Sequence, residues 1–441
     1  MKIAFVIQRY GAEVLGGSEH LCRLVAERLS GIHDVEVLTS CARDYVTWTN
    51  EYPEGADRIR GVTVRRFATT ATRDIDAFNR FSEWIYANPH SHSDELEWLK
   101  QQGPWSPGLV DYLRRNQNQY DVFIFFTYLY APTVLGLDVA PARSILVPTA
   151  HDEPAIRLDI FKDVFKKPAA LCYLTESEQH FVQLQFHERP MLEEIVGVGI
   201  DLPEQQPYPR MPAPVDEEQP LGQAAADPPE AAAYDDGALA ASDEELAARE
   251  FPSHLLARGS VFRRRHRLYG PIALYGGRID PGKGCEELIQ YFGEYVKDGG
   301  DATLALMGVK LMALPEEPYI RFAGRLSDRE RLQALEAATV VVCPSPYESL
   351  SLLALEALSV GTPILANARS AVLVEHCVRS NGGLFYADRD EFVESLKLLV
   401  GDDRLRAALG RNGRDYVANT YRWDVVLGKY ERLFAKIRNA R

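Results

Sequence analysis

Cysteine is scarce in this sequence, and the cysteines present are scattered. No two of the six form a Cys-x-x-Cys pair, and none stands at metal-ligand spacing from a histidine; they are Cys22, Cys41, Cys172, Cys285, Cys343 and Cys377. This distribution disfavours both a zinc site and a disulfide framework. We expect the cysteines to be small residues of the core.

A long hydrophobic run is also absent. The longest apolar stretch, residues 122–137, contains Thr127, Pro132 and Gly136 and is shorter than a bilayer crossing requires. Residues 1–7 read as a strand and not as a signal peptide. The sequence therefore predicts a soluble protein of the cytoplasm.

Positive charge is in short supply as well. The formal net charge is −14, and residues 204–250 alone hold twelve acidic residues against two arginines. Without a basic stripe, nucleic acid is excluded as an expected partner. The short cluster at residues 263–267 is best explained as an arginine-rich helix end. Peripheral contact with the inner face of a membrane stays open, because a folded surface can carry a local basic patch.

Hydrophobic residues are plentiful, at 46% of the 441 residues, which is enough for two cores. Strand patterns alternate with helix patterns, as in α/β domains. Between the two halves, residues 204–258 are rich in proline, alanine, aspartate and glutamate. This composition predicts an acidic linker or a partly helical insertion whose role cannot be read from the sequence.

The most informative segment is residues 339–366. Residues 339–343 read as a central parallel strand, after which Pro344 and Pro346 enforce a loop. A helix is expected to begin near Ser349 or Leu350. Glu348 then lies at the carboxyl end of the strand, where open α/β sheets bind ligands, and Glu356 lies in the second helical turn on the same side.

Between these two carboxylates, the free N–H groups at the start of the helix, around Leu350 and Ser351, would point into the same crevice. The carboxylates suit hydroxyl groups and the amides suit phosphate. Two glutamates chosen at random are more often solvated surface residues. The apolar neighbours of Glu356 argue against that explanation here, since a carboxylate on an apolar surface is costly without a partner.

This segment closely resembles the signature of the retaining nucleotide-sugar glycosyltransferases of family 4, which have the GT-B fold. The resemblance implies that Glu348 contacts the donor sugar and Glu356 the nucleotide ribose. Ser349, Leu350 and Ser351 stand where the family commonly has Gly-Phe-Gly, a change that keeps the backbone amides for the donor and alters the space for the sugar.

The resemblance covers most of residues 1–200 and 268–438 and implies two Rossmann-like, doubly wound domains facing each other across a cleft. An acceptor domain is expected over residues 1–203 and a donor domain over 259–420. The helix of residues 421–441 is expected to return to the first domain.

A second strong motif begins the donor domain at residues 272–284. A strand runs into a glycine-rich loop that carries Arg278 and Lys283 on either side of a Pro-Gly turn. Two fixed positive charges at this spacing can reach opposite phosphates of a diphosphate. Either residue alone would more often be a surface charge. Their order before the two glutamates matches the family, which implies that both bind the donor diphosphate during catalysis.

Four further residues gain meaning from the resemblance. Gly16 and Gly17 lie in the first βα turn, which lacks the dinucleotide fingerprint and on its own indicates only a tight turn; in the family this turn faces the donor phosphates. His151 follows a strand and corresponds to a histidine that contacts the donor sugar or the acceptor. Arg325 lies in the loop that meets the nucleobase.

The predicted function is transfer of a sugar from a UDP- or GDP-hexose type of donor to an acceptor hydroxyl, with retention of configuration. The family implies no metal or other cofactor, and Asp74 and Asp76 are too isolated to indicate one. The acceptor is expected to be a saccharide, a lipid-linked sugar or another hydroxyl compound, in cell-surface polysaccharide or glycolipid synthesis by analogy. The alternatives are a sugar-nucleotide epimerase or hydrolase and a non-catalytic sugar-nucleotide-binding scaffold.

Overall fold

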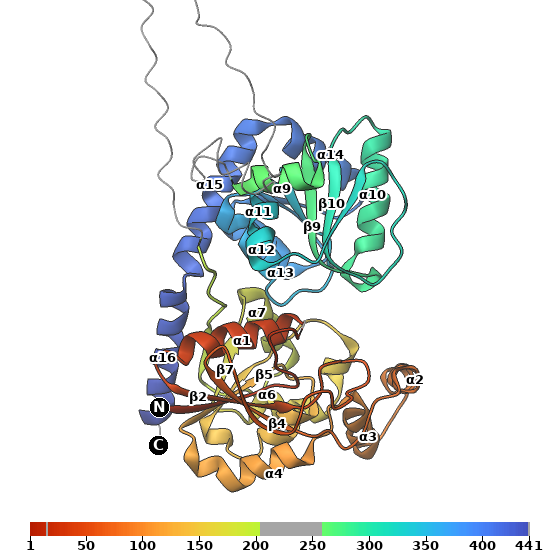
Figure 1. The fold of residues 1–441 in the computed structure, drawn as a ribbon. Coiled ribbons are helices and arrows are strands. Elements are labelled where there is room, and N and C mark those ends of the chain that lie inside the picture. Colours follow the sequence, from red (N-terminus) through yellow and green to blue (C-terminus); the bar gives the residue numbers. More distant parts are fainter. Residues whose placement is uncertain (15, 203–257, 440–441) are drawn as a thin grey trace, which may run out of the picture.

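The computed structural model describes residues 1–14, 16–202 and 258–439, which form two α/β domains arranged one above the other (Figure 1). The predicted fold class is therefore confirmed. Apart from its last position, the predicted linker 204–258 lies outside the described residues.

The first domain is built on a sheet whose strand order is β3-β4-β2-β1-β5-β6-β7-β8. Neighbouring strands are parallel except for the antiparallel pair β3 and β4. The order reverses at β1, so the loop after β1 opens at a topological switch point, where doubly wound sheets bind ligands. The strands are β1 (Lys2–Val6), β2 (Asp34–Ser40), β3 (Gly55–Ile59), β4 (Val62–Phe67), β5 (Val122–Phe126), β6 (Ser144–Val147), β7 (Ala170–Tyr173) and β8 (Glu193–Ile195).

The helices of this domain cover both faces of the sheet. They are α1 (Gly17–Leu29), α2 (Ile75–Ala87), α3 (His92–Gln102), α4 (Pro107–Asn116), α5 (Ala131–Gly136), α6 (Ile160–Lys166) and α7 (Glu176–Gln185), with short 3₁₀ turns η1 (Gln117–Gln119), η2 (Pro141–Arg143) and η3 (Pro154–Arg157).

The second domain has a wholly parallel sheet in the order β11-β10-β9-β12-β13-β14. Here the order reverses at β9, which lies between β10 and β12. Its elements are α9 (Arg258–His266), β9 (Ile272–Ile279), η4 (Pro281–Lys283), α10 (Cys285–Lys297), β10 (Thr303–Lys310), β11 (Ile320–Gly324), α11 (Asp328–Ala337), β12 (Val340–Cys343), α12 (Leu352–Val360), β13 (Ile364–Asn367), α13 (Ala371–Ser380), β14 (Gly383–Tyr386), α14 (Arg389–Gly401) and α15 (Asp403–Thr420).

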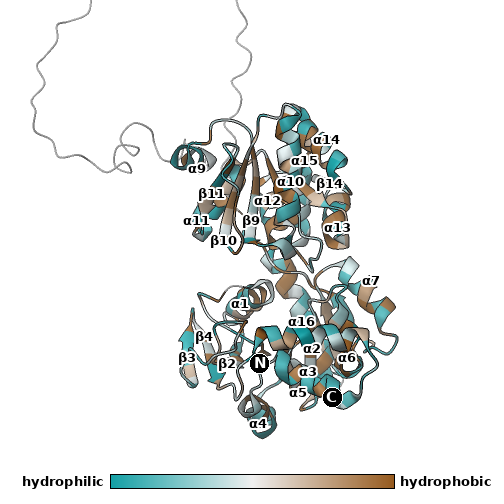
Figure 2. Ribbon diagram, turned by 90° about the vertical axis from the view of Figure 1, so that its right-hand side faces the viewer, coloured by the Kyte–Doolittle hydropathy of each residue, from teal (hydrophilic) through white to brown (hydrophobic). Residues whose placement is uncertain are grey.

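Hydrophobic side chains concentrate on the strands and on the inward faces of the helices (Figure 2). The central strands are buried along their whole length, as parallel strands covered on both faces must be. All six cysteines are buried and unpaired, so the expectation that they are small core residues is confirmed. Among the described residues, no helix is both long and apolar enough to span a bilayer.

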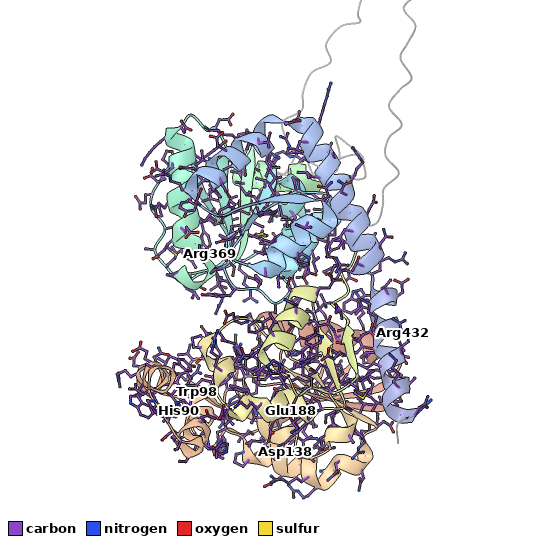
Figure 3. The ribbon with its side chains drawn as sticks, turned by 180° about the vertical axis from the view of Figure 1, so that it is seen from behind. His90, Trp98, Asp138, Glu188, Arg369 and Arg432 are labelled. Carbon is purple, nitrogen blue, oxygen red and sulfur yellow. The ribbon has the colours of Figure 1, made fainter. Side chains whose placement is uncertain are left out.

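The last helix, α16 (Trp423–Asn439), leaves the second domain and lies along the first (Figure 1). Leu433 and Phe434 on its apolar face join the same hydrophobic cluster as Val25 of α1. Lys429 donates from Nζ to the carbonyl of Ile195 at 2.9 Å. Arg432 is labelled on this helix in Figure 3, beside the first domain. The chain therefore crosses between the domains a second time before it ends.

The domains also touch where α7 of the first meets α13 of the second. Glu375 on α13 accepts hydrogen bonds from the amides of Ser177 at 2.7 Å and Glu176 at 3.2 Å, which lie in the first turn of α7. A carboxylate at a helix N-terminus satisfies free N–H groups and the helix dipole. This contact, with the pair Arg379 and Glu176, fixes one side of the cleft.

The segment from Asp74 to Tyr120 contains α2, α3 and α4. Trp98 is buried and donates to the hydroxyl of Ser82 at 2.9 Å, so it is a core residue (Figure 3), whereas Trp84 is 44% exposed. Asp74 caps α2 by accepting from the amides of Asp76 and Ala77. The spacing of Asp74 and Asp76 therefore has a structural explanation.

Two segments of the first domain are shaped by contacts between distant parts of the chain. The last strand, β8, ends at Ile195, and the amides of Val196 and Gly197 then donate to the carbonyl of Tyr173. At the start of α7, Thr175 accepts from the amide of Glu178, whereas the Glu178 carboxylate accepts from the amides of Ala150 and Leu174. Both residues therefore serve the fold.

Candidate active site between the domains

A cavity of about 740 Å³ opens between the two domains. Its walls come from the turn after β1 and the start of α1 in the first domain, and from the carboxyl end of β10 and the loops after β9, β11 and β12 in the second. These loops follow the carboxyl ends of parallel strands and include both topological switch points. The cavity therefore lies where a doubly wound fold places its ligands.

The end of β9 carries Arg278 and the following turn η4 carries Lys283, so that both reach the cavity wall. Asp280 shapes the loop by accepting from the amide of Lys283 at 2.9 Å. Gly284 follows at φ 74°, and a Cβ there would meet the carbonyl oxygen of Pro344 at 2.3 Å. Glycine is therefore required for this loop to approach the one after β12.

That close approach joins the two strong sequence motifs. Nζ of Lys283 lies 2.8 Å from Oε1 of Glu348, and both side chains line the cavity. They are 30% and 19% exposed, so the pair is half-buried and accessible from the cavity. Glu348 thus holds the lysine in place by a charge-assisted hydrogen bond.

The helix after Glu348 begins later than its sequence predicts. Its first residue is Leu352, and Ser351 adopts a left-handed conformation with φ 61°. The reason lies at Leu350, which is 2% exposed and whose carbonyl accepts from Nε2 of His376 at 2.6 Å. This anchor holds the chain out of helical conformation for one more residue.

The later start changes which groups face the cavity. Ser351, Leu352 and Leu353 line it, whereas Ser349 and Leu350 do not. The free amides at the amino end of α12 are therefore those of its first residues, beginning at Leu352. The amides expected around Leu350 and Ser351 lie one to two residues before this point.

Glu356 lies one helical turn further along α12 and lines the same cavity as Glu348. Its carboxylate is 13% exposed and pairs through Oε1 with Nη2 of Arg331 on α11 at 2.8 Å. Burial raises the pKa of Glu356 to about 7, although Arg331 acts in the opposite direction. Arg331 could not be singled out from the sequence, because it lies far from Glu356 along the chain.

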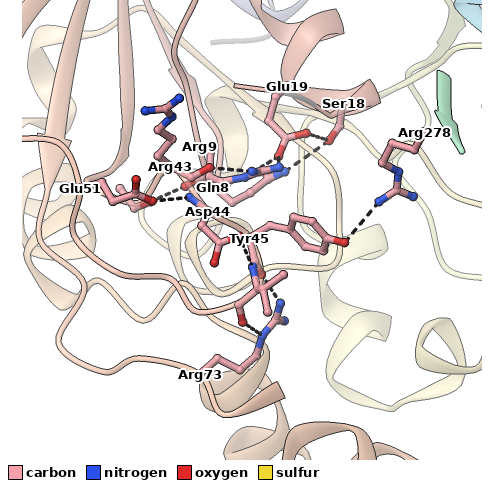
Figure 4. Close-up of polar contacts among 12 residues, drawn as sticks. Gln8, Arg9, Ser18, Glu19, Arg43, Asp44, Tyr45, Glu51, Arg73 and Arg278 are labelled. Atoms are coloured by element: carbon pink, nitrogen blue, oxygen red, sulfur yellow. Dashed lines mark hydrogen bonds and ion pairs between the residues drawn. The ribbon is translucent and has the colours of Figure 1, made fainter. Parts of the chain in front are cut away.

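The first domain contributes Gly16, Gly17 and the start of α1. A Cβ on Gly16 would lie 2.0 Å from Oε2 of Glu19, so the carboxylate packs directly under the turn. Glu19 is buried and is held by Arg9, whose Nε donates to it at 2.9 Å. Figure 4 shows this buried ion pair, with Ser18 also bonded to Glu19.

A contact crosses the cleft beside this network. Nη1 of Arg278 donates to the hydroxyl of Tyr45 at 3.4 Å, and Arg9 stacks over the Tyr45 ring at 5.3 Å (Figure 4). The second domain's Arg278 is therefore linked, through one aromatic ring, to the ion pair under the Gly16-Gly17 turn.

His151 lies outside this cavity, beyond the carboxyl end of β6. Its ring is 6.1 Å from that of Tyr347, the residue before Glu348. Its Nε2 lies 3.8 Å from Oε1 of Glu153, which accepts from the hydroxyl of buried Tyr128 at 2.6 Å. His151 thus faces the loop of Glu348 across the cleft, with an anchored carboxylate behind it.

Arg325 lines the cavity in the loop between β11 and α11, as its sequence position predicts. The arginines at 263–267 serve mainly the fold: Arg263 donates to the carbonyls of Gly270 and Ala337, and Arg265 pairs with Glu330. Among the described residues, no cluster of three or more His, Cys, Asp or Glu side chains could hold a metal ion.

The cavity has an excess of positive charge in an acidic protein. Six cationic side chains line it against three carboxylates, Asp328, Glu348 and Glu356; the cations are Arg23, Arg60, Arg278, Lys283, Arg325 and Arg331. A cleft of one sign concentrates ligands of the other. The arrangement suits an anionic ligand that also presents hydroxyl groups.

Comparison with known proteins shows sequence similarity to glycosyltransferases. Residues 261–416 match the family described as "Glycosyl transferases group 1". Over 172 residues, 35% of this chain and 45% of the relative, the sequence is 26% identical to a "GDP-mannose-dependent monoacylated alpha-(1-6)-phosphatidylinositol monomannoside mannosyltransferase" of Corynebacterium glutamicum. It is 35% identical over 128 residues, 27% of this chain and 30% of the relative, to an "MMP alpha-(1->4)-mannosyltransferase" of Mycolicibacterium hassiacum. The matches thus span less than half of each relative's length.

Solved structures resemble the whole chain. A sucrose-phosphate synthase from Thermosynechococcus elongatus has a TM-score of 0.65 at 16% identity, with 100% of both chains covered. The Anabaena protein HepE in complex with UDP and glucose has a TM-score of 0.63 at 14% identity, again with 100% of both covered. The chain therefore has the GT-B fold of glycosyltransferases, and residues 261–416 of its second domain match the group 1 family model.

Proposed function

We propose that this protein is a retaining glycosyltransferase of family 4, which transfers a sugar from a nucleoside-diphosphate sugar to an acceptor hydroxyl. One observation carries the proposal: two cations, two carboxylates and a helix amino end from separate loops meet in one cavity between the domains. Relatives named as mannosyltransferases and a solved structure with UDP and glucose support this class of donor.

In this proposal Arg278, Lys283 and the first amides of α12 bind the diphosphate. They stabilise the charge that grows on the leaving phosphate as the glycosidic bond breaks, which is where electrostatic catalysis acts. Glu348 orients the sugar, and Glu356 accepts from the ribose. Gly16 and Gly17 let the backbone approach the phosphates, and Arg325 lies beside the base.

The acceptor reaches the sugar from the side of the first domain, where His151 faces the loop of Glu348. We place the reaction at the cytoplasmic side of cell-surface polysaccharide or glycolipid synthesis, in line with the relative named as a phosphatidylinositol monomannoside mannosyltransferase. No metal is assigned to the reaction, so chelation by EDTA is expected to leave turnover unchanged.

The test is a panel of UDP- and GDP-sugars, read by thermal shift and by product formation with saccharide and glycolipid acceptors. Lys283→Ala and Glu356→Ala are the control variants. Stabilisation by one nucleotide class, lost in both variants and accompanied by transfer to an acceptor, supports the proposal. Free sugar or an isomer formed equally well without acceptor indicates a hydrolase or epimerase. Binding without turnover of any donor indicates a scaffold.

A further inference from the structure

Arg331 occupies an unusual position at the cavity wall. Its Nη2 lies between two carboxylates, 2.8 Å from Oε1 of Glu356 and 3.6 Å from Oδ1 of Asp328. Its Nε is buried and has no hydrogen-bond partner among the described residues. Leaving a buried donor unpaired is unfavourable, so Arg331 keeps this position for the ion pairs of its Nη2 and not for a hydrogen bond of its Nε.

Glu356 depends on this arginine. Its carboxylate lies among apolar residues of α12, and its ion pair with Arg331 is the only one it forms among the described residues. The pair uses Oε1, and no described residue bonds to Oε2. A carboxylate fixed at one oxygen presents the other in a defined direction, as hydroxyl recognition requires.

We propose that Arg331 is a positioning residue for the nucleoside end of the donor site, which holds Glu356 through Oε1 and leaves Oε2 free to accept from a ribose hydroxyl. The proposal rests on the function proposed above. It extends that function to a residue on a different helix, α11, which neither strong motif includes.

Arg331 controls the charge of Glu356 as well as the position of its carboxylate. Burial places the pKa of Glu356 at about 7, with Arg331 lowering it and Asp328 raising it. Loss of the arginine removes the one opposing charge, so the pKa rises further. A protonated carboxyl group is a weaker acceptor for a hydroxyl, and donor binding at neutral pH then weakens.

Other titratable and charged groups face this cavity, and any of them that titrates near pH 7 would contribute to the pH dependence of donor binding. Lys283 and Glu348 come from the loops after β9 and β12, Arg325 from the loop after β11, and His20 and Arg23 from α1 across the cleft. Burial and Arg23 lower the pKa of His20 to about 4, so it stays neutral in the range where Glu356 titrates. Arginine and lysine keep their charge there.

The experiment measures binding of UDP-glucose and of GDP-mannose by calorimetry, from about pH 5.5 to about pH 8.5, a range that brackets ordinary histidine ionisation. In a sugar nucleotide both phosphates are esterified and do not titrate in this range. The variants are Arg331→Met, Arg331→Lys and Glu356→Gln. Arg329→Met is the matched control, because Arg329 is exposed on the same helix and does not line the cavity.

We expect wild-type affinity to rise with pH through about 7, the pKa of Glu356. Arg331→Met should bind at least fivefold more weakly at neutral pH, and its midpoint should move by about one unit or more toward alkaline pH. It should regain affinity at the alkaline end. Arg331→Lys should fall between these two, and Glu356→Gln should bind weakly with no dependence on pH. Arg329→Met should match the wild type.

The outcomes separate this inference from the proposed function. If the wild type binds neither sugar nucleotide, both the proposed function and this inference are overturned. If the wild type binds and Arg331→Met has the same affinity and pH profile as Arg329→Met, the inference alone is overturned. If Arg331→Met is uniformly weaker without a shifted profile, and Arg331→Lys does not restore binding, the arginine is a structural residue and the positioning role is refuted. Thermal unfolding without ligand identifies a misfolded variant, in which case Arg331→Lys and Glu356→Gln decide.

Discussion

The ion pair between Lys283 and Glu348 leads to a prediction in which substitutions of its two residues change nucleotide affinity in opposite directions. The proposed diphosphate site needs the ammonium group, yet this group is already bonded to Glu348 at 2.8 Å. A nucleoside diphosphate must therefore compete with the glutamate for the lysine. Removing the lysine and removing the charge of the glutamate should change its affinity in opposite directions.

The magnitudes follow from the geometry. A hydrogen bond to a charged group contributes ~1.5–3 kcal/mol, so Lys283→Met should weaken UDP or GDP binding by roughly 10- to 150-fold. Glu348→Gln removes one negative charge beside the site; a unit charge at 4 Å is worth ~1 kcal/mol in water and more in a partly buried cleft. Glu348→Gln should therefore tighten binding of the free nucleotide by roughly fivefold or more while sugar transfer falls.

Calorimetry with UDP and GDP, paired with a turnover assay, measures both effects. Neither variant should lose much stability, because half-exposed ion pairs contribute ~0–1 kcal/mol. The reasoning is refuted if Glu348→Gln weakens nucleotide binding as Lys283→Met does, since that result would make Glu348 a direct ligand of the nucleotide and not a competitor for the lysine.

Three further predictions concern the fold around the site. Gly284→Ala should destabilise the protein and weaken nucleotide binding together, since its Cβ would meet a backbone oxygen at 2.3 Å with φ 74°; chemical denaturation and calorimetry measure the two losses. His376→Phe should lower the free energy of unfolding by ~1–3 kcal/mol, because it leaves the buried carbonyl of Leu350 unpaired. Turnover should fall as well, because Ser351 and α12 lose the contact that positions them. An unchanged denaturation midpoint would contradict this. Burial raises the pKa of Glu178 from its unfolded value of 4.5 to about 8. The stability that this group contributes is therefore fully present below pH 4.5 and is lost as pH rises to about 8, by ~1.4 kcal/mol per pKa unit. Glu178→Gln should make the melting temperature less dependent on pH over that interval.

Much of the fold and of the cavity was predictable because the signals are local. The buried strand at Val340–Cys343 and the Pro-Gly turn before Gly284 are each recognisable from a few neighbouring residues. Parallel strands bring their carboxyl ends to one edge, so local motifs at strand ends become neighbours in space. Arg278, Lys283, Glu348 and Glu356 meet for this reason.

What the sequence could not predict depends on contacts between distant segments. Arg331 reaches Glu356, His376 reaches the Leu350 carbonyl, and Glu178 bonds to the amide of Ala150 across 28 positions. In each case a common residue type becomes important only through the packing of two helices or loops. The same holds for Ser351, whose left-handed conformation follows from the anchor at Leu350 and delays the helix.

The cations proposed to bind the donor diphosphate share one property: each is already held by an acceptor of the chain. Lys283 is bonded to Glu348, and Arg278 to Tyr45 of the opposite domain. Under the proposed function, Lys283 and Arg278 each give up a partner within the chain when they bind the diphosphate. The new contacts therefore replace existing ones, which limits the affinity for the donor. The exchange at Arg278 also breaks a bond that crosses the cleft. The diphosphate therefore acts on the contact between the domains as it binds, and Tyr45→Phe should strengthen diphosphate binding without touching the donor.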